Sequence, residues 1–199
     1  MNASALDNPD GALSVEDQIL DAARSCILEH GVRRTNLAEI ARRAGVSRPT
    51  VYRRWSDTRA IVSSLLTREI GSVMPRFEAD MSARRQIAGA AADVADKVRT
   101  HPLFVKILDT DPDILATYIL HRLGTSQALI IDALVPLVGS GQHAGSIRDG
   151  DPVHLSTVVL LMVQSAVQSA DMVSQRISGH DLVVQMAYAV DAYLRPPGS

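Results

Sequence analysis

Apolar residues recur every three or four positions along most of this chain, which is the spacing that places them on one face of an α-helix. The first stripe runs from Val15 to Ile27, with Ser14 before it as a candidate N-cap and Gly31 after it as a candidate C-cap. No segment alternates apolar and polar residues in the manner of a half-exposed β-strand. The pattern therefore predicts an all-α protein.

Three further helical segments follow closely. The first begins near Asn36, which precedes a glutamate at capping-box spacing, and it breaks at Gly45. The second is capped by Ser47, and the third opens at Asp57 and should end or kink at Pro75. Two helices joined by a tight glycine turn predict a helix-turn-helix.

The rest of the chain stays helical but changes character. We expect one helix at 76–99, then a short segment after the break at His101–Pro102, then a helix from Asp111 or Pro112 to about Val138. A loop is expected at 139–152, and the last two helices at about 152–177 and 180–194. Residues 1–13 carry Asn, Asp, Pro and Gly without periodicity and are expected to form a disordered arm. The expected domains are then 14–56 for the helix-turn-helix, 57–74 for a linking helix, and 75–199 for a larger helical domain.

The segment from Arg48 to Trp55 is the most informative part of the pattern. On a helix with 100° per residue, Val51 and Trp55 fall on one side and must face the core. The opposite side and its flanks then present Pro49, Thr50, Tyr52, Arg53 and Arg54 to solvent. Such a face fits the major groove of DNA, where base edges lie at the centre and phosphates along both walls.

Charge strengthens this interpretation because it is local. The whole chain has a formal net charge of −2, yet the segment from Arg24 to Arg68 carries ten arginines against three acidic residues, Glu29, Glu39 and Asp57. A basic region of this kind is the electrostatic footprint of a nucleic-acid-binding surface. A solvated basic face on a small helical bundle is the simpler alternative, and it would suffice for the pair Arg42 and Arg43 taken alone.

Several other classes of protein find no support in the sequence. The single cysteine, Cys26, lies in an apolar helical pattern and is expected to be buried. No segment resembles a secretion signal or reaches the ~20 apolar residues of a membrane helix, so we expect a cytoplasmic protein. Nucleophile, metal-ligand and phosphate-loop motifs are also missing, so we expect no enzyme activity, no cofactor and no metal.

At this point the sequence resembles a known family. The stretch "TNLAEIARRAGVSRPTVYRRWSDTRAIV", Thr35–Val62, is similar to the DNA-binding region of TetR-type (tetracycline-repressor-like) transcriptional regulators. The similarity is carried by "IARRAGVS", by "PTVY", and by an aromatic residue two positions before the start of the next helix. It implies a homodimer that binds a palindromic operator in double-stranded DNA, usually as a repressor, and that responds to a small-molecule effector.

The resemblance also implies roles for individual residues. Arg48, Pro49 and Arg53 correspond to base readers. Phosphate contacts correspond to Thr35, Asn36, Ser47, Thr50, Tyr52 and Arg54. The family commonly has lysine where this chain has Thr58, so Arg59 is the candidate for that phosphate contact, and Trp55 replaces a usual phenylalanine.

In the larger domain the resemblance implies an effector pocket and a four-helix dimer interface. The pocket candidates are Met74, Phe77, Met81, Phe104, Leu108, Tyr118, His121 and Met162, whose character suggests a mainly apolar effector. For each of them, ordinary core is the simpler interpretation. The last two helices are apolar around much of their circumference, and the expected interface residues are Val158, Leu161, Ser165, Val167, Met172, Val184 and Tyr188. The alternative is that these helices only complete the core of the monomer.

A rival function remains open from the sequence alone. A helical adaptor could bind RNA or an acidic protein through the basic N-terminal face and have no effector pocket. Strong salt dependence together with preference for one duplex palindrome would favour the regulator over the adaptor.

Overall fold

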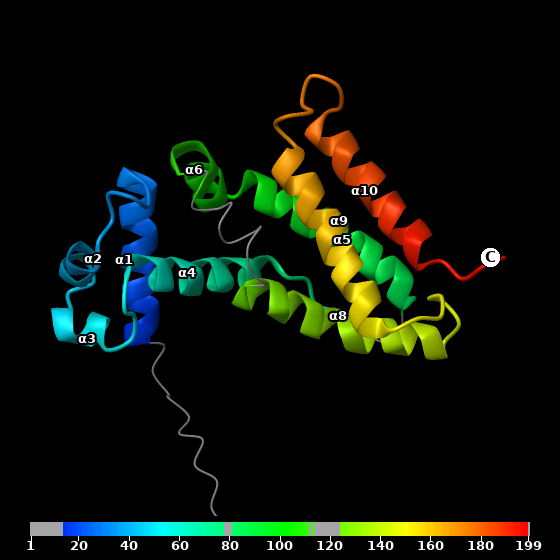
Figure 1. Ribbon diagram of the computed structural model, residues 1–199, viewed down its shortest axis with the longest axis horizontal. Coiled ribbons are helices and arrows are strands. Elements are labelled where there is room, and N and C mark those ends of the chain that lie inside the picture. The colour runs from blue at the N-terminus through cyan, green and yellow to red at the C-terminus, as the bar shows by residue number, and fades with distance from the viewer. Residues whose placement is uncertain (1–13, 78–80, 112, 114–123, 199) are drawn as a thin grey trace, which may run out of the picture. The chain divides into compact units, whose positions relative to one another are not determined.

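The computed structural model describes residues 14–77, 81–111, 113 and 124–198, and within these ranges it contains helices and no strands. The helices are α1 (Val15–His30), α2 (Leu37–Arg43), α3 (Arg48–Tyr52), α4 (Thr58–Val73), α5 (Ala83–Thr100), α6 (Pro102–Thr110), α8 (Thr125–His143), α9 (Pro152–Ser169) and α10 (Gly179–Leu194) (Figure 1). The predicted all-α class is confirmed.

The chain divides into two compact units, Met1–Leu65 and Leu66–Ser199, and the division falls within α4. Unit 1 holds α1 to α3 and the first half of α4. Its core is built from fully buried aliphatic side chains of all four helices: Ile19, Ile27, Ile40, Val51, Ile61 and Leu65. Because α2 and α3 each contribute only one large residue of this kind, the unit depends on all four helices packing together.

The helix ends of unit 1 are fixed by local hydrogen bonds that the sequence predicted. The Ser14 hydroxyl accepts from the backbone N–H of Asp17, and the Asn36 side chain accepts from that of Glu39 at 2.9 Å. Ser47 accepts in the same way from Thr50, and Gly31 ends α1. Gly45, between α2 and α3, has φ +67°, a left-handed conformation that glycine adopts without steric cost.

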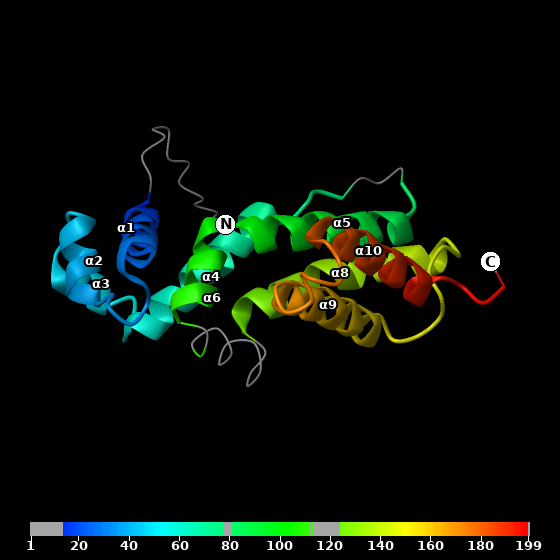
Figure 2. The ribbon, with the colours of Figure 1, turned by 90° about the horizontal axis from the view of Figure 1, so that it is seen from above.

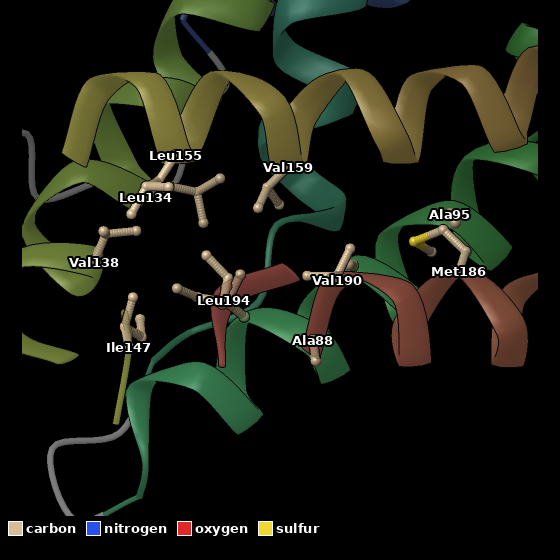
Figure 3. Packing of buried hydrophobic residues seen from close by; sticks show 12 residues of the cluster. Ala88, Ala95, Leu134, Val138, Ile147, Leu155, Val159, Met186, Val190 and Leu194 are labelled. Carbon is tan, nitrogen blue, oxygen red and sulfur yellow. The ribbon is translucent and has the colours of Figure 1, made fainter. Parts of the chain in front are cut away.

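Unit 2 is built from α5, α8, α9 and α10, with α6 attached to the end of α5 (Figure 2). α10 packs along α5, and α8 packs along α9. Their facing sides enclose an aliphatic core in which Leu134 and Val138 of α8 meet Leu155 and Val159 of α9, with Val190 and Leu194 of α10 beside them (Figure 3). Such interdigitated aliphatic packing is what fixes the mutual register of helices.

Two predicted boundaries in unit 2 are wrong. The expected helix 152–177 ends at Ser169, because residues 171–177 form turns in which the Ser174 hydroxyl bonds the carbonyl of Asp171 instead of continuing the helix. Conversely, the expected loop at 139–152 starts too early, since α8 continues to His143. Gly141 lies within this helix, and Ile147 packs against it so closely that an added Cβ would lie 2.5 Å from the Ile147 side chain.

A third boundary is also wrong, because the helix expected from 76 begins only at Ala83. Pro102 opens α6 in the first-turn position that proline tolerates. The beginning of the helix expected from Asp111 or Pro112 lies largely outside the described residues, as does the arm at 1–13. No helix among the described residues combines the length and apolarity that crossing a membrane requires.

Candidate nucleic-acid interface

The helix-turn-helix is formed by α2, a turn at Gly45 and α3. After α2 ends, the backbone N–H of Val46 bonds the carbonyl of Ala41 at 3.0 Å and reverses the chain. Ser47 then caps α3, and its hydroxyl also pairs with that of Thr50 at 2.7 Å. These short-range contacts fix α3 relative to α2, so the side chains of α3 are presented from a rigid support.

One side of α3 and of the turn after it is anchored in the core, as predicted. Val51 is fully buried and Trp55 is 5 % exposed. The indole Nε1–H of Trp55 donates to the hydroxyl of Ser64 on α4 at 2.9 Å, so the buried indole has its polar group satisfied. The inward orientation of this pair is therefore confirmed.

The opposite side is open to solvent. Arg48, Pro49, Tyr52, Arg53 and Arg54 are all exposed, and Thr50 is half-buried. The sequence pattern predicted one helix from Arg48 to Trp55, but α3 ends at Tyr52, where the N–H of Arg54 bonds the carbonyl of Val51 three residues back and closes a turn. Arg53 and Arg54 thus leave the end of α3 rather than its side.

The arginines of unit 1 fall into two electrostatic groups. Arg42 makes a bidentate contact with Glu39 at 2.6 and 3.0 Å, and Arg43 reaches across to Glu29 on α1 at 2.7 Å and to Ser25 at 2.9 Å. The hydrogen bond from Arg42 lowers the pKa of Glu39, and that from Arg43 lowers the pKa of Glu29, so both carboxylates stay ionised at neutral pH. The positive charge of this pair is compensated within the protein.

The arginines at α3 are different. Among the described residues, Arg48, Arg53 and Arg54 have no acidic or hydrogen-bonding side-chain partner. Three uncompensated guanidinium groups therefore lie at or just after one short helix. Arg42 and Arg43, by contrast, are paired with acidic residues, as expected for a solvated basic face that does not bind nucleic acid. The uncompensated charge of unit 1 is concentrated where the sequence predicted base and phosphate contacts.

Other predicted contact residues occupy distinct positions. Asn36 and Arg59 are exposed, and Asn36 and Arg48 border an open groove of about 420 Å³ whose other walls are Ala38, Glu39, Ala41, Arg42 and Val46. Thr35 is the exception: it is 5 % exposed, and its hydroxyl donates to the carbonyl of Gly31 at 2.7 Å. Its side chain joins the end of α1 to the start of α2, a role that sequence spacing did not reveal.

The candidate pocket residues of unit 2 do not share one environment. Phe104 is buried on α6, with its ring edge-on to His101, and Met74 and Leu108 are half-buried. Half-buried Phe77 and Met162 pack against the aliphatic core, so the structure uses them in packing. Met81 is 53 % exposed, and Tyr118 and His121 lie outside the described residues.

The candidate interface residues form an exposed apolar face. Leu161 and Ser165 on α9, Val184 and Tyr188 on α10, and Met172 between these helices are exposed, with Leu161 at 54 % and Tyr188 at 65 %. Val158 is half-buried, and Val167 packs partly against the core. The five exposed residues are thus left largely uncovered by their own unit.

Comparison with known proteins agrees with this geometry. Residues 19–65 match the family model "Bacterial regulatory proteins, tetR family". An uncharacterized HTH-type transcriptional regulator of Mycobacterium tuberculosis is 43 % identical over 177 residues, which is 89 % of this chain and 93 % of that protein. The transcriptional repressor AcnR of Corynebacterium diphtheriae is 26 % identical over 138 residues, 68 % of this chain and 70 % of that one.

Among solved structures, the repressor QsdR of R. erythropolis has a TM-score of 0.67 at 14 % identity, covering 90 % of this chain and 94 % of that one. These similarities define a helix-turn-helix transcriptional regulator. The chain belongs to the TetR family.

Proposed function

We propose that the protein is a homodimeric repressor that binds a palindromic DNA operator and is released by a small, mainly apolar effector. The observation that carries this proposal is the solvent-facing side of α3 and of the turn after it, where Arg48, Arg53 and Arg54 are uncompensated while Val51 and Trp55 anchor the segment in the core. A positively charged surface on a rigid support is suited to binding the polyanionic backbone of a DNA duplex.

The proposed contacts follow from exposure and chemistry. Arg48, Pro49 and Arg53 read base edges, since a guanidinium pairs bidentately with guanine and an apolar ring meets a thymine methyl group. Asn36, Ser47, Thr50, Tyr52, Arg54 and Arg59 contact phosphates. The hydroxyl of Thr35 is engaged inside the protein, so we leave it out of this set.

Dimerisation through α9 and α10 is supported by their exposed apolar side chains. Leu161, Val184 and Tyr188 would otherwise remain in water. One recognition helix covers too few base pairs for strong specificity, so a two-fold symmetric pair on two half-sites is the geometry that a helix-turn-helix needs. The repressor role is supported by the names of AcnR and QsdR.

The effector response rests on the composition of unit 2 and on relatives. One similar structure is a complex with triclosan, and another, FadR of Bacillus subtilis, is a complex with stearoyl-CoA. Triclosan and the stearoyl chain share an apolar character, although the CoA group itself carries charged phosphates. The candidate wall residues that are buried or half-buried here, Phe104, Leu108 and Met74, match that character.

The decisive experiment compares how two substitutions change DNA binding. A duplex library is selected with the wild type, and affinities for the selected site and for a scrambled site are then measured by fluorescence anisotropy. Tyr52→Ala should weaken binding to both duplexes, because it removes a phosphate contact. Arg48→Ala should lose roughly 1–3 kcal/mol only at particular base pairs and so relax the selected sequence there.

Arg85→Ala provides the matched control, because Arg85 is an exposed helical arginine of unit 2. It should leave both affinities unchanged. If the Arg48 and Tyr52 variants bind both duplexes as the wild type does, the proposed interface is wrong. If selection yields no preferred duplex and an RNA binds more tightly, the adaptor function replaces the regulator.

A further inference from the structure

The contact between α8 and α9 changes from aliphatic to amide along its length. On α8, Gln127 is on the same face as Ile131, Leu134 and Val138, at helical spacings of four, three and four, and these three are buried. The amide at the end of this buried stripe is the third residue of α8, where its side chain accepts from the backbone N–H of Gly124 as in a capping box.

The facing row on α9 shows the same change. Ser156 and Leu160 are buried, and the next two positions of the same i, i+4 row are Gln164 and Gln168. α8 and α9 are neighbours in unit 2, and Gln127 near the start of α8 contacts Gln164 in the second half of α9, with Gln168 one turn further along α9. Neither row contains a charged residue.

The hydrogen bonds fix the direction in which these amides point. The backbone N–H of Gly124 donates to Gln127 Oε1 at 2.7 Å, which leaves Gln127 Nε2 to donate to Gln164 Oε1 at 2.6 Å. Gln164 must then turn its Nε2 group away from α8. Within the described residues that NH₂ group has no protein acceptor.

Gln168, one turn further along α9, adds a second donor. Its Nε2 atom is buried and has no hydrogen-bond partner. Leaving a buried donor without an acceptor costs the full desolvation of the group, so the missing acceptor is expected from a water or another bound molecule. Gln168 thus offers a buried donor that the protein itself does not satisfy, and Ser156 Oγ is a second buried side-chain atom of the row without a partner.

We propose that Gln164 and Gln168 form the polar end of the effector site and bind an uncharged carbonyl group (a ketone, ester, lactone or amide) on an otherwise apolar molecule. A carbonyl oxygen has two lone pairs and can accept from both NH₂ groups. An ionised carboxylate fits less well, because burying it needs a cationic partner that neither row provides. This inference rests on the proposed effector response and adds the chemistry that the effector must carry.

The test uses the full-length protein and matched probes. Thermal shifts are measured with 2-undecanone and cyclododecanone as linear and cyclic ketones, and with undecanoate and undecane as the charged and carbonyl-free counterparts. A ketone should stabilise the wild type more than either counterpart. Gln168→Leu should weaken ketone binding roughly tenfold, the equivalent of one lost hydrogen bond, and raise the melting temperature of the free protein.

Two further variants make the outcome decisive. Gln168→Met preserves the length of the side chain and should behave like the leucine variant if that one folds poorly. Gln175→Leu makes the same change at an exposed position in the turn before α10 and should alter neither ketone binding nor the melting temperature of the free protein.

Three results would overturn the proposal: no ketone stabilises the wild type, undecanoate or undecane stabilises it as well as a ketone, or both Gln168 variants bind ketone as the wild type does. Operator binding is measured in parallel. If a ketone binds through Gln168 but does not dissociate the DNA complex, the proposed carbonyl site stands, and the proposed release of DNA by the effector is wrong.

Discussion

At the scale of single residues, the contact that holds the recognition segment is the pair Trp55 and Ser64. Trp55 is the single tryptophan of the chain, and its indole N–H has the Ser64 hydroxyl as acceptor inside a largely buried site. Ser64→Ala leaves that donor without an acceptor. We expect unit 1 to lose about 1–3 kcal/mol of unfolding free energy.

Urea unfolding followed by tryptophan fluorescence measures this loss, because the only indole reports on unit 1. Ser56→Ala, at an exposed position in the same segment, is the control and should change the midpoint little. An unchanged midpoint for Ser64→Ala would mean that the hydrogen bond adds nothing to the burial of the indole.

At the scale of the elements, the sequence could predict what depends on neighbours in the chain. The caps at Ser14, Asn36 and Ser47 and the inward side of Val51 and Trp55 involve residues only a few positions apart. The pairing of Arg43 with Glu29 joins two helices across fourteen positions and leaves no local signal. For the same reason the sequence could not show that Met81 is exposed or that Gln168 lacks an acceptor.

The ion pair between Glu39 and Arg42 on α2 allows a test of whether pairing of arginines within the protein limits DNA binding. The hydrogen bond from Arg42 lowers the pKa of Glu39, and the Glu39 carboxylate neutralises that arginine beside the groove bordered by Asn36 and Arg48. Glu39→Gln removes the charge and frees Arg42 for a phosphate. We expect tighter binding to a non-specific duplex and a salt dependence steeper by up to ~0.9 in log–log slope.

The slope is obtained from anisotropy titrations at several salt concentrations. Glu16→Gln, which removes an exposed carboxylate in the first turn of α1, controls for the change in net charge. Equal slopes for the two variants and the wild type would show that Arg42 does not reach a phosphate when it is released from Glu39.

At the scale of the whole molecule, the distribution of charge and apolar surface separates two tasks. Unit 1 concentrates uncompensated arginine at one short helix, and unit 2 carries exposed apolar side chains on α9 and α10. The overall charge of −2 hides this division. A monomer would present one weak DNA contact and an apolar face in water, so specific binding and a stable dimer should depend on each other.

This dependence can be tested with two valines of nearly equal exposure. Val184 on α10 is 48 % exposed and lies in the proposed interface, whereas Val105 on α6 is 47 % exposed and lies outside it. Val184→Asp would bury a carboxylate in each half of a symmetric interface, where no compensating charge is provided, and this is strongly unfavourable.

Sedimentation velocity should show that Val184→Asp is a monomer and that Val105→Asp keeps the oligomeric state of the wild type. In anisotropy titrations Val184→Asp should lose most of its affinity for the full palindrome but retain that for an isolated half-site, because unit 1 is unchanged. A dimeric Val184→Asp protein, or a monomer that binds the palindrome as tightly as the wild type, would show that α9 and α10 do not supply the contact between the two copies.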